Sequence, residues 1–411
     1  MTRLAGSSKL LRAMNESAAL AHLLDPGMLT RSDLRKLTAL STPTISEVLR
    51  RLTEARLVNV VGYNSGRPGP NAEIYAANPD AAYTAAVSVR DIGTSGTPSV
   101  TAALCDLTGS VRARFESRVD FLATQPVDGL VEVVDRLHRE AGVAADGIRH
   151  VQIGVPGSYD PRTETISHVD VPGFARPGLV PEIAAALGTH IGVDNDVNLA
   201  AVAERKRGTG RDADGFALLW IGQDGLGLAI DIAGSLIRGA RGGAGEIGYM
   251  PLYSPDSAQR KLDLQDLFGG AAILELAADN GIAGDTPAEV VRAATAPTDS
   301  PGLGSGTAPP TDSPGLGSST AFVTALADRI AVGLAAVTAV LDPYLVVLAG
   351  PIAQAGGGTL LAAVTAAARR TAPLESTIAL TTIDDDAVLL GALDAGLTAV
   401  REALITAIRD S

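Results

Sequence analysis

The stretch Val193-Asp194-Asn195-Asp196-Val197-Asn198 joins a short apolar run, residues 189–193, to a helical pattern that starts at Leu199. A strand that ends in carboxylates and amides at a helix start places polar side chains at the edge of an α/β sheet, where such sheets bind small molecules. Asn and Asp can recognise hydroxyl groups, and an Asp can also act as a general base. Asp and Asn are equally favoured at helix N-caps, so this stretch alone leaves both capping and ligand binding open.

Composition predicts a protein of two or three domains in a reducing compartment. The chain has 411 residues, 46% of them hydrophobic but only 3% aromatic, and is too long for one small core. Its one cysteine, Cys105, excludes a disulfide framework and a multi-cysteine metal site. The sequence shows no signal peptide and no uncharged apolar run of the roughly 20 residues that a membrane span needs. We therefore expect a cytoplasmic protein with no membrane partner.

The charge is distributed unevenly along the chain. The formal net charge is −13, yet residues 1–80 carry ten Lys and Arg against seven Asp and Glu, which leaves 23 against 39 for the rest. A basic head on an acidic body predicts that the head meets a polyanion.

The basic head shows three helical patterns, at residues 10–24, from Thr30 and at 41–52, each with apolar residues at three- and four-residue spacing. Asp33 completes a capping box with Thr30, and a Ser-Thr-Pro start caps the third helix. Two strand patterns then enclose a tip rich in Gly, Pro and Arg. This order predicts a winged helix-turn-helix, and the alternative is a three-helix module used for dimerisation.

The third helix of the head has the features of a helix that lies in a DNA major groove. Its buried stripe consists of Ile45, Val48, Leu49 and Leu52, so short hydroxyl side chains, Glu47 and two arginines lie largely on the other faces. Hydroxyls near the helix start can approach bases and phosphates, while arginines reach the DNA backbone. The predicted DNA-binding residues are Thr42, Pro43, Thr44, Ser46 and Arg50 on the helix and Arg67 on the wing.

One strand-turn-strand pattern occurs twice in the body. Two strands joined by a turn rich in Gly occur at residues 85–107 and again at 215–232, about 130 residues apart. The first turn, residues 90–99, holds Asp, Gly and Thr, as in the actin-like ATPase fold, where such turns approach ATP phosphates. The repeat predicts two similar lobes around a cleft, and the stretch around Asn195 falls between them.

The motifs of the body, taken in order, resemble the ROK family of bacterial sugar kinases and sugar-responsive transcriptional regulators. They are IGVPG at 153–157, DNDVNLAA at 194–201, RGA at 238–240 with GAGEIG at 243–248, and LDPYLVVLAGP at 341–351. The regulators of this family carry an N-terminal winged helix, which residues 40–46 and 66–69 resemble. The resemblance covers nearly the whole chain. It implies an α/β protein with an N-terminal winged helix-turn-helix and a two-lobed actin-like ATPase (ribonuclease H-like) ROK domain.

This resemblance divides the chain into three predicted domains. Residues 1–80 form the DNA-binding domain, residues 81–195 the first ROK lobe, and residues 196–388 the second. A C-terminal helix at about 389–411 packs back on the first lobe. The near repeat within residues 295–320 is rich in Pro, Gly, Ser and Thr and cannot bury a core, so it predicts a disordered surface insertion.

The resemblance also implies a sugar site. In ROK kinases an Asn-Asp pair binds sugar hydroxyls and its Asp is the catalytic base; Asn195 and Asp196 stand at those places. The Glu of the family's Gly-Glu-Ile-Gly-His pattern is matched by Glu246, the His by Tyr249, and a later sugar-binding Glu by Gln265. The predicted ligand-binding residues are Gly157, Asn195, Asp196, Glu246, Tyr249 and Gln265.

Departures from the family pattern predict that zinc and ATP are not used. Tyr249 replaces a zinc-binding His, and residues 261–270 contain no Cys, so too few zinc ligands remain. The first phosphate loop, residues 90–98, lacks the Gly-Gly pair of the kinases, and the second has Gln223-Asp224, whose carboxylate would repel a phosphate. Phosphoryl transfer depends on phosphate positioning and charge neutralisation. We therefore expect no metal, no cofactor and no kinase activity, with Asp196 at the position of the base but without a catalytic role.

Three hypotheses follow from the sequence. The first is a repressor of carbohydrate-metabolism genes that binds double-stranded operator DNA as a homodimer or dimer of dimers and responds to a sugar or sugar phosphate. The second is an ATP-dependent sugar kinase with an appended DNA-binding domain. The third is a ligand-independent architectural repressor whose cleft no longer binds a sugar.

Overall fold

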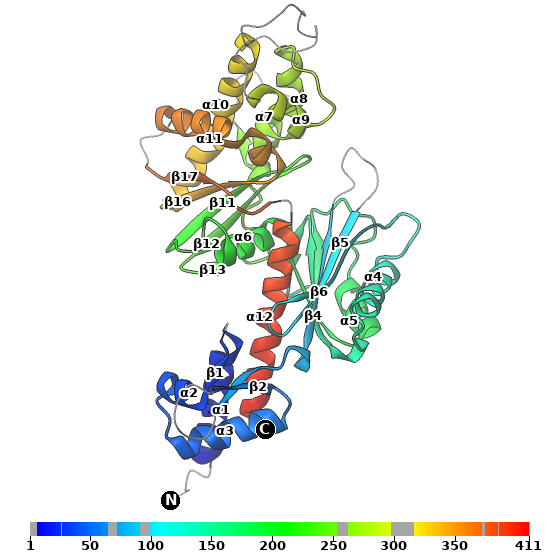
Figure 1. Cartoon of the computed structure of the whole chain (residues 1–411). Helices are drawn as coiled ribbons and strands as arrows, with labels where there is room; N and C mark the ends of the chain where they lie inside the picture. The colour runs from blue at the N-terminus through cyan, green and yellow to red at the C-terminus, as the bar shows by residue number, and fades with distance from the viewer. Residues whose placement is uncertain are drawn as a thin grey trace, which may run out of the picture.

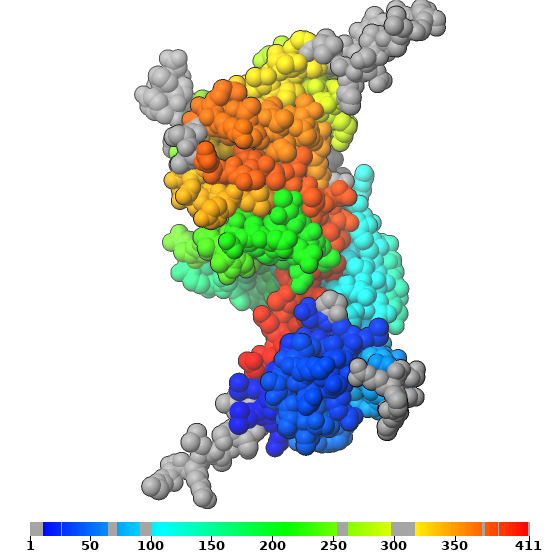
Figure 2. All heavy atoms as spheres, turned by 60° about the vertical axis from the view of Figure 1, so that its left-hand side comes forward, coloured from blue at the N-terminus to red at the C-terminus, as the bar shows by residue number. Residues whose placement is uncertain are grey.

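The structure, a computed structural model, describes residues 6–25, 27–64, 72–90, 99–252, 262–296, 316–371, 375–384 and 386–410. It consists of an N-terminal head and two five-stranded sheets, with a long C-terminal helix, α12 (Ala387–Asp410), that runs between the sheets and into the head (Figure 1). In the space-filling view the head joins the rest of the molecule through a narrow neck that includes α12 (Figure 2).

The described residues of the head form three helices and three strands. They are α1 (Gly6–Leu24), β1 (Leu29–Thr30), α2 (Arg31–Thr38), α3 (Thr42–Glu54), β2 (Val58–Asn64) and β3 (Ala72–Ala77), with the strand order β1-β3-β2. The predicted caps are confirmed, because Thr30 and Asp33 form a capping box on α2 and the side chain of Ser41 accepts a bond from the backbone N–H of Thr44. Strand β1 was not predicted, since two residues show no alternation.

The apolar stripe of α3 forms the centre of the head. Ile45, Val48, Leu49 and Leu52 are each 2% exposed or less. They pack with Leu20 and Leu23 of α1 and with Leu34 of α2. Because this stripe is buried on the inner side, the opposite side of α3 is left to solvent, as the sequence predicted.

The first body sheet has the strand order β10-β7-β4-β5-β6. Its strands are β4 (Tyr83–Val89), β5 (Ser99–Asp106), β6 (Val111–Arg118), β7 (Ile148–Val155) and β10 (His190–Asn195). The first three are antiparallel neighbours, and β7 and β10 run parallel to β4. Helices α4 (Pro126–Ala141) and α5 (Leu179–Leu187) cover one face and α12 the other. Covering both faces buries every residue of β4.

The second body sheet has the order β13-β12-β11-β16-β17. Its strands are β11 (Gly215–Ile221), β12 (Leu226–Ile232), β13 (Ser235–Leu236), β16 (Leu345–Ala349) and β17 (Thr377–Leu380). Helix α6 (Asp196–Arg207) covers one face. The other face packs against α7 (Leu264–Phe268), α8 (Gly270–Asp279), α9 (Pro287–Thr295), α10 (Leu316–Leu341) and α11 (Pro351–Thr371). Two short hairpins, β8 (Ser158–Asp160) with β9 (Thr165–Ser167) and β14 (Pro251–Leu252) with β15 (Leu262–Asp263), stand outside the sheets.

The two sheets share one topology, three antiparallel strands followed by two parallel ones, which confirms the predicted pair of similar lobes. Each lobe also supplies a helix to the other: α6 follows the first sheet and covers the second, while α12 follows the second and covers the first. The two helices cross closely at Gly391, where a Cβ would lie 1.7 Å from the carbonyl oxygen of Leu199.

Helix α12 connects the body to the head. Its first half packs on β4, β5 and β7, and its last turns pack on the head. Val400 is 3% exposed and belongs to the apolar core of the head, against which Leu404, Ile405 and Ile408 also pack. The guanidinium of Arg401 donates to the carbonyl oxygen of Leu107 at 2.9 Å. The sequence indicated that this helix returns to the body but not that it continues into the head.

The insertion predicted at residues 295–320 has different bounds in the structure. Helix α9 ends at Thr295 and α10 begins at Leu316, while residues 297–315 lie outside the described residues. No proline follows Pro314 in this segment, so helical hydrogen bonding extends further back than predicted, and the Thr324 hydroxyl donates to the Thr320 carbonyl. By length and composition Gly317–Leu341 could cross a membrane, but half of its most apolar window is buried, as in a core helix.

Candidate functional site

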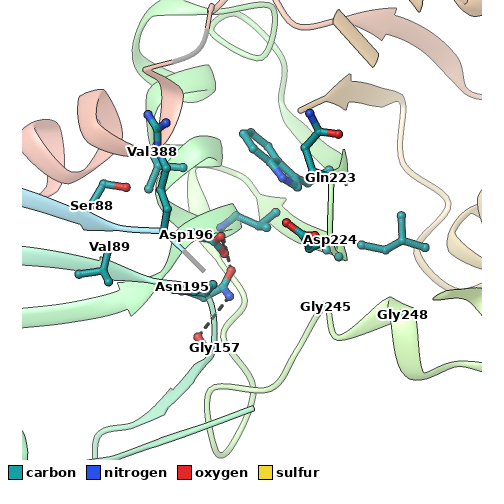
Figure 3. Close-up of a pocket in the computed structure, with 18 of the residues that line it drawn as sticks. Ser88, Val89, Gly157, Asn195, Asp196, Gln223, Asp224, Gly245, Gly248 and Val388 are labelled. Carbon is teal, nitrogen blue, oxygen red and sulfur yellow. Dashed lines mark hydrogen bonds between the residues drawn. The ribbon is translucent and has the colours of Figure 1, made fainter. Parts of the chain in front are cut away.

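A cavity of about 920 Å³ lies between the two body sheets. All six residues that the sequence predicted as ligand contacts line it: Gly157, Asn195, Asp196, Glu246, Tyr249 and Gln265. In Figure 3, Asn195 and Asp196 lie near the middle, with Val388 of α12 on one side and Asp224 on the other. The fold therefore brings together residues that are more than 100 positions apart in sequence.

Asn195 ends β10 and caps α6. Its side-chain oxygen accepts bonds from the backbone N–H groups of Val197 (2.9 Å) and Asn198 (3.2 Å). Its side-chain nitrogen donates to the carbonyl oxygen of Gly157 at 3.2 Å, a contact drawn in Figure 3. The capping interpretation is therefore confirmed for this residue, and ligand binding stays a prediction, for which the cap orients the amide at the cavity wall.

Asp196 is the first residue of α6 and is half-buried. One carboxylate oxygen accepts the backbone N–H of Val197 at 2.8 Å. The partial positive charge of a helix N-terminus stabilises a carboxylate there. Asp196 therefore presents an acceptor to the cavity from a rigid helix start.

Asp194 is a positioning residue that the sequence did not single out. Its carboxylate is largely buried and accepts two bonds from the Arg238 guanidinium, at 2.9 and 2.7 Å, and one from the side chain of Asn198 at 3.1 Å. Arg238 begins the loop that carries Glu246. This ion pair therefore ties the loop of the second lobe to the strand end of the first.

Replacing Asp194 with asparagine should lower the free energy of unfolding by about 1–3 kcal/mol, because the half-exposed Arg238 loses its charged acceptor and the buried Asn198 amide its strongest partner. Urea denaturation followed by the fluorescence of Trp220, the one tryptophan, measures this change. Asp212→Asn, an exposed carboxylate outside the cavity, is the control. Equal stability of the two variants would show that the ion pair does not hold the loop.

Glu246 and Tyr249 form the opposite wall of the cavity. The Glu246 carboxylate accepts a bond from the Ser158 hydroxyl of β8. The ring of Tyr249 lies 5.3 Å from the ring of His168. The pKa of the Tyr249 hydroxyl is raised, mainly by burial and to a smaller extent by the negative charge of Glu246. The loop is fixed at Gly245, whose φ of +95° and closeness to the Leu228 carbonyl exclude a side chain.

Gln265 lines the cavity, but its amide holds the second Gly-rich turn. Its side-chain oxygen accepts the backbone N–H of Leu226 at 3.1 Å, and its nitrogen donates to the carbonyl of Asp224 at 2.8 Å. Because both ends of the amide bond this turn, Gln265 has a positioning role that the resemblance did not indicate. The turn leaves the Asp224 side chain exposed at the cavity edge.

The side of the cavity next to α12 is formed by the first sheet. Ser88 and Thr101 line it from paired positions on β4 and β5, and two arginines, Arg90 and Arg114, stand beside them. The predicted first phosphate loop lies outside the described residues apart from Arg90. Among the described residues, no three His, Cys, Asp or Glu side chains are placed to hold a metal ion.

Four of the predicted DNA contacts lie together on the first turns of α3. Thr42 and Pro43 are exposed, while Thr44 and Ser46 are half-buried. The Thr44 hydroxyl lies 2.8 Å from that of Ser41, and the Ser46 hydroxyl donates to the Thr42 carbonyl. Arg67 lies outside the described residues.

Arg50 is exposed but paired. Its guanidinium donates twice to Glu47, at 2.9 and 2.7 Å, and once to Glu54 at 2.5 Å. Glu47 also accepts a bond from Arg51 at 2.8 Å. These hydrogen bonds, with Arg50 first and Arg51 second, lower the pKa of Glu47 to about 2. The pairing of Glu47 with both arginines was not predicted, although the spacing of three and four residues indicates such pairs.

Known repressors match about three fifths of the chain, and a known kinase matches a shorter stretch of it. A xylose repressor of Caldicellulosiruptor bescii is 24% identical over 255 residues, covering 61% of this chain and 62% of the repressor, and a putative xylose repressor of Caldicellulosiruptor sp. is 22% identical over 249 residues. The chain thus spans about three fifths of the length of these repressors. A beta-glucoside kinase of Listeria innocua is 37% identical over 101 residues, which are 24% of this chain and 34% of the kinase.

Solved structures show the same fold. A ROK family transcriptional regulator, a homolog of the E. coli MLC protein, covers 98% of this chain and 100% of its own, with a TM-score of 0.73 and 18% identity. A ROK hexokinase from Thermus thermophilus covers 78% of this chain with a TM-score of 0.60 and 23% identity. The sequence model of the ROK family matches residues 91–263, which include β5, β10 and the loop that carries Glu246. Residues 91–263 of this chain therefore carry a ROK family domain.

Proposed function

We propose that this chain is a sugar-responsive transcriptional regulator, a repressor of carbohydrate-metabolism genes that acts in the cytoplasm. One observation carries the proposal: α12 begins at the cavity, where Val388 and Leu389 line the wall, and ends in the core of the head at Val400 and beyond. A helix of 24 residues is about 36 Å long. The full-length fold match to a ROK transcriptional regulator and the partial matches to xylose repressors support this proposal.

The head, residues 1–80, is proposed to be a winged helix-turn-helix that binds operator DNA. Helix α3 would enter the major groove with Thr42-Pro43-Thr44 and Ser46 near the bases and Arg50 near the backbone, while Arg67 contacts DNA from the wing. The exposed outer face of α3 supports this orientation. A homodimer or dimer of dimers would present two such helices to a palindromic site.

The cavity between the lobes is proposed to bind the effector, a sugar or sugar phosphate. Its volume of about 920 Å³ lies in the range of small-molecule sites, and carboxylates and amides suit hydroxyl groups. Asn195, Asp196, Glu246 and Tyr249 would contact the sugar, beside the backbone of Gly157. The effector regulates DNA binding only if its affinity differs between the arrangements of the lobes.

Sites selected from a random duplex library by the full-length protein provide the DNA probe for the test. We expect one palindromic site to be enriched, and one sugar of a panel to change its affinity while raising the melting temperature and altering Trp220 fluorescence. Asp196→Ala should remove the sugar effect and leave DNA binding in place. Site affinity that no sugar changes would favour the ligand-independent repressor, and failure to enrich any site would contradict the DNA-binding proposal.

A sugar kinase with an appended DNA-binding head is the second candidate. It is favoured by the position of Asp196 at a helix start inside the cavity and by the partial match to beta-glucoside kinases. Against it, the turn at Asp224 places an exposed carboxylate at the cavity edge, where a phosphate would be repelled. We therefore propose that the chain is not an enzyme. ADP release over the sugar panel should stay at background, and turnover abolished by Asp196→Asn would establish the kinase.

A further inference from the structure

The described side chains that line the cavity carry more negative than positive charges. Six carboxylates line it, Glu116, Asp170, Asp196, Asp224, Glu246 and Asp386, against two guanidinium groups, Arg90 and Arg114. The two arginines stand on the first sheet, beside Ser88 and Val89, which Figure 3 places on the side of the cavity away from Gly245 and Gly248. The cavity therefore has an end with mixed charges and an end with carboxylates.

Each of the two arginines forms an ion pair with a carboxylate at the same end of the cavity. The Arg114 guanidinium donates to both oxygens of Asp386 at 2.7 Å, which ties β6 to the start of α12. Arg90 lies 3.5 Å from Glu116. A bound anion would have to displace these pairs, so this end offers little net positive charge.

At the other end of the cavity, the part of the chain that the structure describes places no cation beside the carboxylates. Among the described residues, Asp170, Asp224 and Glu246 form no ion pair, and no lysine or arginine lines the cavity near them. Glu246 has a hydroxyl partner, Ser158, instead of a cation. Carboxylates held in this way accept hydrogen bonds from hydroxyl or ammonium groups and repel phosphates.

A second observation indicates that the cavity is built for a polar ligand. Thr101, on β5, lines it and is 1% exposed, and its hydroxyl has no hydrogen-bond partner within the described part of the chain. A buried hydroxyl without a partner is unfavourable unless a ligand or water supplies one. A polyhydroxylated ligand that fills the cavity can supply this bond.

We propose that the effector is an unphosphorylated sugar, and that a sugar bearing a protonated amino group is bound at least as well as its neutral analogue. This proposal rests on the proposed function of the cavity as a sugar site, and it removes sugar phosphates from the candidate effectors. A phosphate dianion would approach Asp224 or Glu246, and none of the described residues beside them supplies a compensating cation. The same carboxylates attract an ammonium group, since the Coulomb energy changes sign with the charge of the ligand.

Matched ligands test the proposal on the full-length protein. Glucose, glucosamine and glucose 6-phosphate form one set, and xylose with xylose 5-phosphate another, each titrated calorimetrically and by Trp220 fluorescence. In the set that binds, we expect the free sugar to bind at least about tenfold more tightly than its phosphate ester at low salt. The ratio should shrink at high salt, because ions screen the repulsion. Exclusion by shape alone would leave the ratio independent of salt.

Variants that each neutralise one carboxylate separate the effect of charge on ligand binding from an effect on folding. Asp224→Asn should narrow the ratio between free sugar and phosphate ester, while the exposed Asp212→Asn, outside the cavity, should leave it unchanged. Tighter binding of the phosphate ester than of the free sugar would overturn the charge selectivity and leave the sugar-sensor proposal standing. If no ligand of either kind binds although the protein unfolds cooperatively, the sugar-sensor proposal fails and the charge selectivity fails with it.

Discussion

Replacing Val400 with aspartate is expected to abolish specific DNA binding while the sugar still stabilises the body. Val400 is 3% exposed within the apolar core of the head, where it belongs to the same cluster as Leu20 and Leu57. Placing an unpaired carboxylate in an apolar core typically destabilises that core by several kcal/mol. The head should then detach from α12 or unfold, and the two copies of α3 in the proposed dimer would lose their fixed spacing.

Two measurements on each variant distinguish a detached head from a misfolded protein. Anisotropy with the selected DNA site reports the head, and the sugar-induced change in Trp220 fluorescence reports the body. Thr398→Asp, an exposed position two residues earlier on the same helix, should bind DNA and sugar as the wild type does. Val400→Ala, which only removes two methyl groups, should give a partial loss. Normal DNA binding by Val400→Asp would show that the head acts independently of α12.

Local patterns explain why much of the fold was predictable. The buried stripe of α3 and the caps of α2 and α3 depend on spacings within a few residues, and these spacings are visible in any sequence. The two similar lobes were also predictable, because a strand, a Gly-rich turn and a strand occur twice. Glycine positions such as Gly245 mark where backbone must approach backbone.

Contacts across long sequence separations were not predictable in the same way. Asp194 pairs with Arg238, 44 positions away, and nothing local distinguishes it from its neighbour Asp196. The sequence predicts that Gln265 contacts a sugar, but both ends of its amide form hydrogen bonds to the turn at Asp224. The C-terminal helix was predicted to pack back on the first lobe, but nothing in the sequence indicated that α12 also continues into the head.

The α3 arginines are a different case, since their partners are local. Glu47 stands three and four residues before Arg50 and Arg51, the spacing at which helix side chains meet. Considering only the arginines predicts a positively charged outer face. With Glu47 and Glu54 included, the same face carries two positive and two negative charges.

Replacing Glu47 with glutamine is expected to raise the affinity for non-specific DNA about tenfold and to weaken the preference for the selected site. With its pKa lowered to about 2, Glu47 stays ionised at physiological pH, where it both repels phosphates and holds Arg50 and Arg51. Removing its charge takes away the carboxylate that Arg50 and Arg51 share and leaves them only Glu54 and Glu16 as partners, so both arginines become more available for backbone contacts. Each added phosphate contact steepens the dependence of log affinity on log salt by about 0.9, so the slope should become steeper by about 1 to 2.

Anisotropy titrations of a scrambled duplex and of the selected site over a range of salt concentrations measure both quantities. Glu140→Gln is the matched control, because Glu140 also pairs with an arginine, Arg136, on a surface helix of the body. It makes the same change in net charge away from the head and should leave the slope unchanged. If Glu47→Gln leaves the slope unchanged as well, α3 does not present its arginines to the phosphate backbone. If the slope rises while discrimination falls, Glu47 lowers the affinity of the head for DNA in general and so favours the selected site.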